Sequence, residues 1–157
     1  IKKKQIGRAV KNNLKNLKII SKIVHPTVRK NMFKFLKNNN LKKCISKLTS
    51  LGAKRSIIKL GNYGMIYSHI DETFFLPALL LDKVVDPTGA GDSFAGGFMG
   101  YLSTVKSADE NEFKSACIYG TVMASFCVED FGTNRTLNLT TEDINTRKNL
   151  LLNQIKI

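Results

Sequence analysis

Apolar side chains recur at helical spacing in two parts of the first third of the chain. The first part predicts an amphipathic helix over Gln5–Lys18, where Lys and Asn separate Val10, Leu14 and Leu17. A short apolar run at Ile19–Val24 then predicts a strand, and the chain is expected to turn at His25–Thr27. The second part predicts a helix that ends with Gly52 as its C-cap, because apolar residues recur at intervals of four, three and three, at Leu41, Ile45, Leu48 and Leu51.

The middle of the chain has the pattern of a hairpin followed by a further strand. A β-branched run at Arg55–Leu60 stops at the turn Gly61–Gly64, and Met65–Tyr67 starts a second strand. Leu79–Val85 predicts another strand, which runs directly into the glycine-rich stretch DPTGAGDSFAGGF at Asp86–Phe98. Apolar residues recur at helical spacing from Phe94 onward, so this stretch is predicted to lie in a strand-to-helix turn.

Two more helices are predicted in the last third. A capping box at Ser107–Glu110 precedes apolar positions that end at Cys127, and Thr140–Asp143 opens the last helix. Strands and helices that alternate at these lengths are typical of an α/β domain with a largely parallel sheet. The 157 residues and 43% hydrophobic content fit a single domain with its own core.

Composition then narrows the class of protein. The apolar stretches are short and interrupted, well below the roughly 18 residues of a membrane span, so no transmembrane helix is expected. The basic start Ile1–Lys4 has no apolar region of a secretory signal behind it, and a start at Ile rather than Met indicates a fragment. Cys44, Cys117 and Cys127 are odd in number and widely spaced, which argues against disulfides and zinc. Reduced thiols and a cytoplasmic location are expected.

The charge is distributed very unevenly. The chain has 25 Lys or Arg, 12 Asp or Glu and a net charge of +13, and all the acids lie at or after Asp71. Such asymmetry suggests a nucleic-acid or other anionic partner. The basic residues alternate with Asn and Ile rather than with stacking aromatics, and no helix-turn-helix, zinc-finger or RNP-type signature is present. Nucleic acid is therefore not the expected partner, although a basic binding module stays open as an alternative.

The glycines of the central stretch fit an anion site. A strand that passes into a helix through Gly89, Ala90 and Gly91 presents backbone N–H groups without partners, and small side chains let an anion reach them. The helix dipole adds about half a positive charge at that end. Glycine also permits the positive φ that such a nest of amides needs. The sequence therefore predicts a phosphate site here.

Asp92 follows these three residues and needs its own explanation. A carboxylate would repel a phosphate unless it takes part in the chemistry. At this position it could accept the proton of a substrate hydroxyl whose oxygen attacks a phosphoryl group. The structural alternative is that Asp92 caps the helix. Close helix packing is the interpretation for the small residues that follow, namely Ala95, Gly96, Gly97 and Gly100.

The motif DPTGAGD at Asp86–Asp92 resembles the second signature of the PfkB/ribokinase family of carbohydrate and nucleoside kinases. Ile57–Gly64 is similar to the family's strand and glycine turn beneath the ATP phosphates, and Ala116–Gly132 resembles its helix beside the adenine. The resemblance implies a ribokinase-like fold. Residues 1–157 would be the C-terminal, nucleotide-binding part of a three-layer α/β/α sandwich with a mostly parallel sheet, without the N-terminal sugar-binding half and lid.

The resemblance also implies roles for particular residues. Asp92 would be the catalytic base, and the amides of Gly89, Ala90 and Gly91 would stabilise the transferring phosphoryl group. ATP and Mg²⁺ would be bound, and Asp86 and Thr88 would hold a monovalent cation, usually K⁺. The nucleotide phosphates would be lined by Lys59, Gly61 and Gly64. From the residues alone, Lys59 could equally face solvent, and the two glycines could simply form a hairpin turn.

Three functions are weighed on these grounds. The main one is an ATP-dependent phosphotransferase acting on a hydroxyl of a small-molecule sugar or nucleoside. The second is a catalytically silent remnant that binds nucleotide weakly, because Val28–Asn31 falls where the family usually has the Asn-x-x-Glu that helps to place Mg²⁺ and phosphate. The third is the basic nucleic-acid-binding module. The absent half, which chooses the substrate in the family, would have to be supplied elsewhere.

Overall fold

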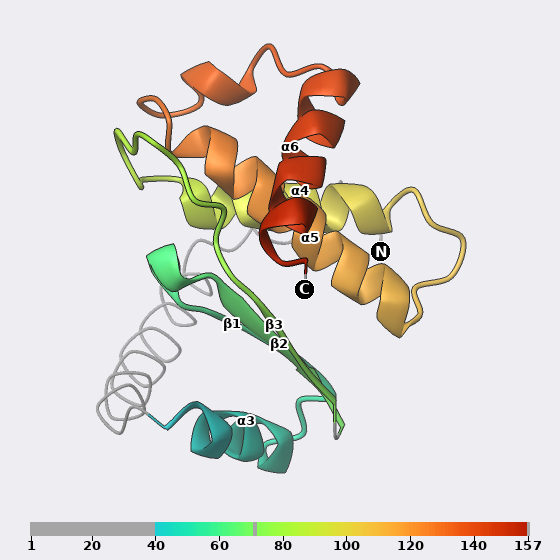
Figure 1. Ribbon diagram of the computed structural model, residues 1–157. Coiled ribbons are helices and arrows are strands. Elements are labelled where there is room, and N and C mark those ends of the chain that lie inside the picture. The colour runs from blue at the N-terminus through green and yellow to red at the C-terminus, as the bar shows by residue number, and fades with distance from the viewer. Residues whose placement is uncertain (1–39, 71, 157) are drawn as a thin grey trace, which may run out of the picture. The chain divides into compact units, whose positions relative to one another are not determined.

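The computed structural model describes residues 40–70 and 72–156. The chain divides into two compact units, residues 1–51 and 52–157 (Figure 1). The elements predicted at Gln5–Lys18 and Ile19–Val24, the turn at His25–Thr27 and the segment Val28–Asn31 lie outside the described residues. That all 157 residues belong to one half of a kinase domain stays a prediction.

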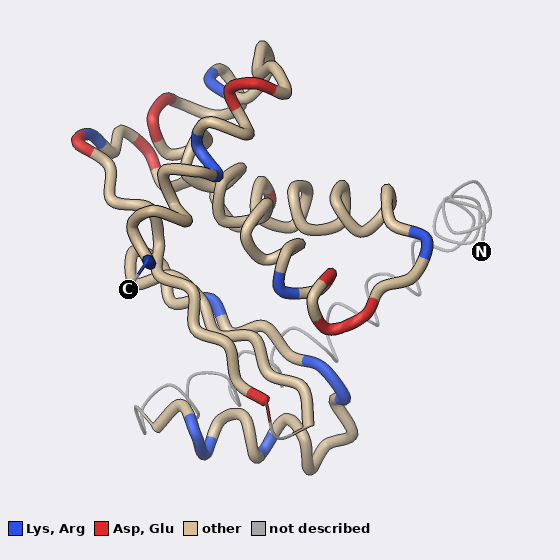
Figure 2. The backbone as a smooth tube through the Cα atoms, turned by 45° about the vertical axis from the view of Figure 1, so that its right-hand side comes forward, with Lys and Arg blue, Asp and Glu red and all other residues tan. Residues whose placement is uncertain are grey.

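The described part of the first unit contains the helix α3 (Leu41–Ser50), as the apolar spacing predicted. Its N-cap is Asn40, whose side-chain Oδ1 accepts a hydrogen bond from Lys43 N at 2.9 Å. The helix ends before Gly52, whose φ of +92° is the left-handed conformation expected just after a helix. The charged side chains of α3 are all basic (Figure 2).

A three-stranded antiparallel sheet opens the second unit, in the order β1 (Arg55–Lys59), β2 (Met65–His69) and β3 (Glu72–Leu76). The β1–β2 hairpin was predicted, and its connection is the short 3-10 helix η1 (Gly61–Tyr63). The third strand was missed. Residues facing the core stand opposite one another across the sheet, as the register Ile57, Tyr67 and Phe74 shows.

The strand predicted at Leu79–Val85 is wrong. Its backbone forms hydrogen bonds with residues at the ends of helices and not with a neighbouring strand. Leu80 N donates to Gln154 Oε1 at 2.8 Å, and Val85 N donates to Val128 O at 2.7 Å. An apolar, β-branched run forms a strand only where another strand supplies its hydrogen bonds, and the described residues supply none here. The mostly parallel sheet implied by the resemblance is likewise not seen among the described strands, which all pair antiparallel.

Three helices pack on one side of this sheet: α4 (Ala90–Leu102), α5 (Glu110–Cys127) and α6 (Thr141–Gln154), with the 3-10 helix η2 (Asn134–Thr136) before the last (Figure 1). The N-cap of α5 is Asp109, so the capping box predicted from Ser107 is wrong by two residues. The capping box that opens α6, formed by Thr140 and Asp143, is confirmed. Among the described residues, none of the helices is both long enough and apolar enough to cross a membrane.

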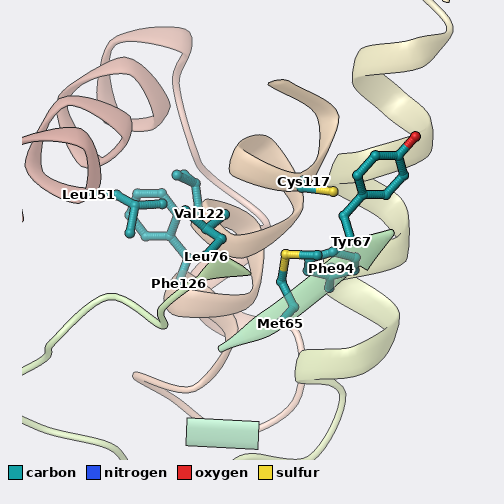
Figure 3. Close-up of a cluster of buried hydrophobic side chains, with 8 residues drawn as sticks. All are labelled: Met65, Tyr67, Leu76, Phe94, Cys117, Val122, Phe126 and Leu151. Atoms are coloured by element: carbon teal, nitrogen blue, oxygen red, sulfur yellow. The ribbon is translucent and has the colours of Figure 1, made fainter. Parts of the chain in front are cut away.

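The core lies where the sheet meets these helices. It draws side chains from two strands and three helices (Figure 3): Met65, Tyr67, Leu76, Phe94, Cys117, Val122, Phe126 and Leu151. Glycines let α4 and α5 approach closely. A Cβ on Gly120 would lie 2.9 Å from the Phe94 carbonyl oxygen, and one on Gly97 would lie 2.7 Å from the Tyr119 carbonyl oxygen.

A polar cluster at the N-terminus of α5 fixes the sheet against the helices. The Glu110 carboxylate accepts hydrogen bonds from Tyr67 Oη at 2.6 Å and from Arg55, and His69 Nδ1 lies 2.9 Å away. The Arg55 guanidinium also lies over the Phe113 ring at 4.4 Å. Burial and the hydrogen bond to Glu110 raise the pKa of Tyr67 to about 12. The phenol therefore stays protonated and keeps donating to the carboxylate.

The glycine contact between α4 and α5 predicts opposite effects of the same substitution at two helical positions. Gly120→Ala places a methyl against rigid backbone and should lower the free energy of unfolding by about 1–3 kcal/mol. At Gly100 a Cβ meets nothing within 4 Å, so Gly100→Ala should be neutral or stabilising, because alanine is the better helix former. Urea unfolding of both variants tests this, and equal destabilisation would contradict the packing.

The raised pKa of Tyr67 predicts a specific alkaline loss of stability. The unfolded phenol releases its proton near its ordinary pKa of 10, whereas the folded one keeps it until about 12. Between these values the folded state binds more protons, so stability should be intact below pH 10 and should fall as pH rises toward 12. Tyr67→Phe should flatten this decline relative to the unsubstituted protein in unfolding measurements across that range. An unchanged slope would exclude the Tyr67–Glu110 hydrogen bond as its source.

Candidate functional site

The glycine-rich motif forms the turn that leads into α4. Gly89 is the N-cap, in the left-handed conformation with φ of +83°. The turn is closed by Ala90 N, which donates to Pro87 O at 3.2 Å, and the first helical hydrogen bond runs from Ser93 N to Gly89 O at 2.8 Å. The amides of Gly91 and Asp92 lie in the first turn, where no helical carbonyl precedes them. The geometry is that of a helix N-terminus open to an anion.

Asp92 lies in the first turn of this helix and is exposed to solvent. Because Gly89 occupies the N-cap position, the structural alternative that Asp92 caps the helix is wrong. Asp92 therefore belongs to the same helical turn as the open amides. The helix dipole favours a negative charge at this end.

Lys59 comes to the motif from a distant part of the sequence. It ends β1, and its Nζ donates to Gly91 O at 3.3 Å and lies over the Phe94 ring at 5.8 Å. The fold thus brings one cation to the first turn of α4. Lys59 is an exposed strand residue, as the structural alternative held, but its ammonium group lies against the motif.

Gly61 and Gly64 form the hairpin connection, as their structural alternative held. Both have positive φ, of +63° and +102°. A Cβ on Gly64 would lie 2.1 Å from Leu76 O, so only glycine fits between the turn and the end of β3. This packing accounts for Gly64, and a role of either glycine at nucleotide phosphates stays a prediction.

Asp86 and Thr88 lie together at the start of the motif. The Asp86 carboxylate accepts a hydrogen bond from Thr88 N at 2.9 Å, which lowers the pKa of that carboxyl. The structure adds two residues that the sequence analysis did not assign to this place: the thiol of Cys127 lies 3.5 Å from Thr88 O and 3.7 Å from Gly132 O. In the sequence, Gly132 was named only as the last residue of the stretch that resembles the family's helix beside the adenine.

The donor set around this point suits an alkali cation. An ionised carboxylate and two carbonyl oxygens, those of Thr88 and Gly132, are the hard oxygen ligands that such ions prefer. Among the described residues, no three His, Cys, Asp or Glu side chains gather into a group that could hold a metal ion by themselves.

Comparison with known proteins finds sugar and nucleoside kinases among the similar proteins. The profile of the pfkB family carbohydrate kinases matches residues 9–140. The nucleoside kinase of Methanocaldococcus jannaschii is 35% identical over 81 residues, which are 52% of this chain and 25% of that protein. The chain thus spans about a quarter of the length of the curated relatives it matches first.

Solved structures show the same likeness. Aminoimidazole riboside kinase from Salmonella enterica, complexed with aminoimidazole riboside and an ATP analog, is 32% identical with a TM-score of 0.57, over 64% of this chain and 33% of that one. Ribokinase from Thermotoga maritima is 30% identical with a TM-score of 0.58, over 69% and 34%. The ribokinase-like fold expected from the sequence is therefore confirmed, and the chain belongs to the pfkB family of carbohydrate kinases.

Proposed function

We propose that this chain is the nucleotide-binding, base-carrying part of an ATP-dependent kinase that phosphorylates a hydroxyl of a sugar or nucleoside. The observation that carries the proposal is the first turn of α4, where an exposed Asp92 stands directly after an amide nest headed by a left-handed Gly89. Family membership supports the reaction class, and the relatives named for riboside, nucleoside and ribose phosphorylation support the range of acceptors.

In the proposed reaction, Asp92 accepts the proton of the acceptor hydroxyl while its oxygen forms a bond to the terminal phosphorus of ATP. The bond from that phosphorus to the bridging oxygen breaks, and ADP leaves with the electron pair. The amides of Gly89 and Gly91 neutralise the charge on the transferring group, whereas Ala90 N already donates to Pro87 O, and the Lys59 ammonium adds a cation on the same side. These groups act by position and charge, so a base of modest strength is sufficient.

Two cations complete the proposal. Mg²⁺ would be carried mainly by the phosphate oxygens of ATP and would neutralise them. K⁺ or a similar ion would be held by the Asp86 carboxylate and the carbonyl oxygens of Thr88 and Gly132, beside the anion nest. Gly61 and Gly64 would approach the nucleotide through their backbone. The cytoplasmic location expected from the sequence remains a prediction.

The chain covers about a third of the length of the solved relatives. We therefore propose that the site for the acceptor hydroxyl needs polypeptide beyond these 157 residues. A silent remnant that keeps only nucleotide binding is the alternative that the experiments must separate from an active kinase. The two tests that follow address binding and chemistry in turn, because a remnant would retain the first without the second.

Calorimetric titration with Mg-ATP tests the anion nest. Gly91→Asp puts a carboxylate where the nest receives phosphate, at a position where an added Cβ meets only the flexible end of Lys59, 2.8 Å from its Nζ. The variant should fold and should lose at least about tenfold in affinity, because a phosphate-binding charge contact is worth roughly 1.5 kcal/mol or more. Gly96→Asp, where an added Cβ meets nothing, is the matched control and should bind as the unsubstituted chain does. Equal binding by both variants would place the nucleotide elsewhere.

Asp92→Asn tests the base. This change keeps the shape of the side chain and removes its ability to take a proton. Turnover should fall by about 10²–10⁴-fold, the range for loss of a general base, while Mg-ATP affinity stays within a few-fold. Asp82→Asn, an exposed acid outside the motif, is the control. Turnover is measured on the complete protein, with the polypeptide that supplies the acceptor site, by ADP release with ribose, fructose and adenosine as acceptors. Unaltered turnover in the Asp92 variant would remove the base role, and Mg-ATP binding without turnover by the complete unsubstituted protein would favour the remnant.

A further inference from the structure

The C-terminal end of α5 contacts the loop Asp86–Gly91, which carries the glycine motif and is called the anion loop below. Val128 O accepts hydrogen bonds from the backbone of two residues at the entry to the loop, Val85 N at 2.7 Å and Asp86 N at 3.3 Å. These bonds fix the entry to the loop. Further along the loop, Thr88 is contacted by the preceding residue of the helix, Cys127.

We propose that Cys127 is a positioning residue of this site, whose thiol hydrogen bond to the loop sets the orientation of the Gly89–Gly91 amides. The consequence for phosphate binding rests on the proposed function, but the loop geometry does not. Cys127 touches no reacting atom in this proposal. It acts through the backbone of Thr88 and Gly89.

The contacts of the sulfur support a donor role. Cys127 is the last residue of α5 and is 1% exposed. Its Sγ lies within donor range of two carbonyl oxygens, those of Thr88 at 3.5 Å and Gly132 at 3.7 Å. A thiol is a weak hydrogen-bond donor, and this one has two carbonyl acceptors within reach. One small side chain thereby links the loop to the segment after the helix.

The same sulfur also supports the left-handed turn. A Cβ on Gly89 would lie 3.5 Å from Cys127 Sγ, so the thiol fills the space on that side of Gly89. Gly89 has φ of +83°, the left-handed conformation in which the chain enters α4. If the loop shifted away from the sulfur, Thr88 O would lose its donor and the turn would lose its support.

Two substitutions separate donation from space filling. Cys127→Ser keeps a hydroxyl donor in a smaller side chain, and Cys127→Val fills similar space without a donor. If the hydrogen bond positions the loop, serine should keep it ordered and valine should not. If the sulfur only packs, the order should reverse, because valine replaces the lost volume and serine does not.

Hydrogen exchange of the whole chain, read by mass spectrometry on peptides covering residues 84–93, measures loop order directly. In Cys127→Val the amides should exchange about three- to tenfold faster than in the unsubstituted chain, the range expected for losing one hydrogen bond. In Cys127→Ser they should exchange within about twofold of it, since a hydroxyl is at least as good a donor as a thiol. Cys117 is the control, because it lies on the same helix but is fully buried in the hydrophobic core (Figure 3). Cys117→Ser and Cys117→Val should change the melting temperature without a selective rise in loop exchange.

Two results would overturn the proposal. One is that the loop amides of Cys127→Val exchange no faster than those of the unsubstituted chain. The other is that they exchange faster in Cys127→Ser than in Cys127→Val. A second readout connects it to function: Mg-ATP affinity should fall in Cys127→Val and be recovered in Cys127→Ser. Equal affinity in both variants despite faster loop exchange in valine would also overturn the positioning role. If the unsubstituted chain binds no Mg-ATP, that result counts against the proposed function alone, and the exchange data still decide the role of Cys127.

Discussion

The close approach of α4 and α5 is the constraint on which the rest of the second unit depends. The two helices meet where Gly97 and Gly120 leave no room for a Cβ, and Phe94 packs directly against Gly120. This contact brings the start of α4 next to the end of α5, since Gly89 lies against Cys127. The glycine-rich loop with Asp92 therefore lies between the start of α4 and the end of α5, and the packing of these helices sets its geometry.

This arrangement places opposite ends of two helix dipoles side by side. The start of α4 is its positive end, which favours an anion, whereas the end of α5 is its negative end and, with Asp86 and the nearby carbonyls, favours a cation. A phosphate and a monovalent cation could therefore be held within one small region without mutual exclusion. Lys59, at the end of β1, adds a positive charge at the first turn of α4.

The sheet is held in place from its opposite end. Arg55 at the start of β1 and Tyr67 on β2 both bond Glu110 at the first turn of α5, and Lys59 at the other end of β1 reaches α4. Strand β1 is therefore fixed at both ends by polar contacts to two helices. Its length determines how far the Lys59 ammonium reaches over the glycine motif.

Much of this could be read from the sequence where the signal is local. The hairpin at Gly61–Gly64, the cap at Thr140 and the end of α3 just before Gly52 were predicted because turn and cap residues act on their immediate neighbours, although the C-cap itself is Leu51 rather than Gly52. The motif at Asp86–Asp92 was located for the same reason, as a run of small residues before an apolar helical repeat. Leu79–Val85 failed because a strand needs a partner strand, which the residue pattern of one segment does not show.

The sequence by itself indicated the family and located the glycine-rich turn with its acidic residue, because these depend on contiguous residues with special backbone needs. Only the tertiary structure decided which distant groups meet at that nest. Lys59, Cys127 and Gly132 come to it from β1, from the end of α5 and from the segment beyond. Their arrival depends on helix packing and strand register, and these interactions between distant segments leave no local trace in the chain.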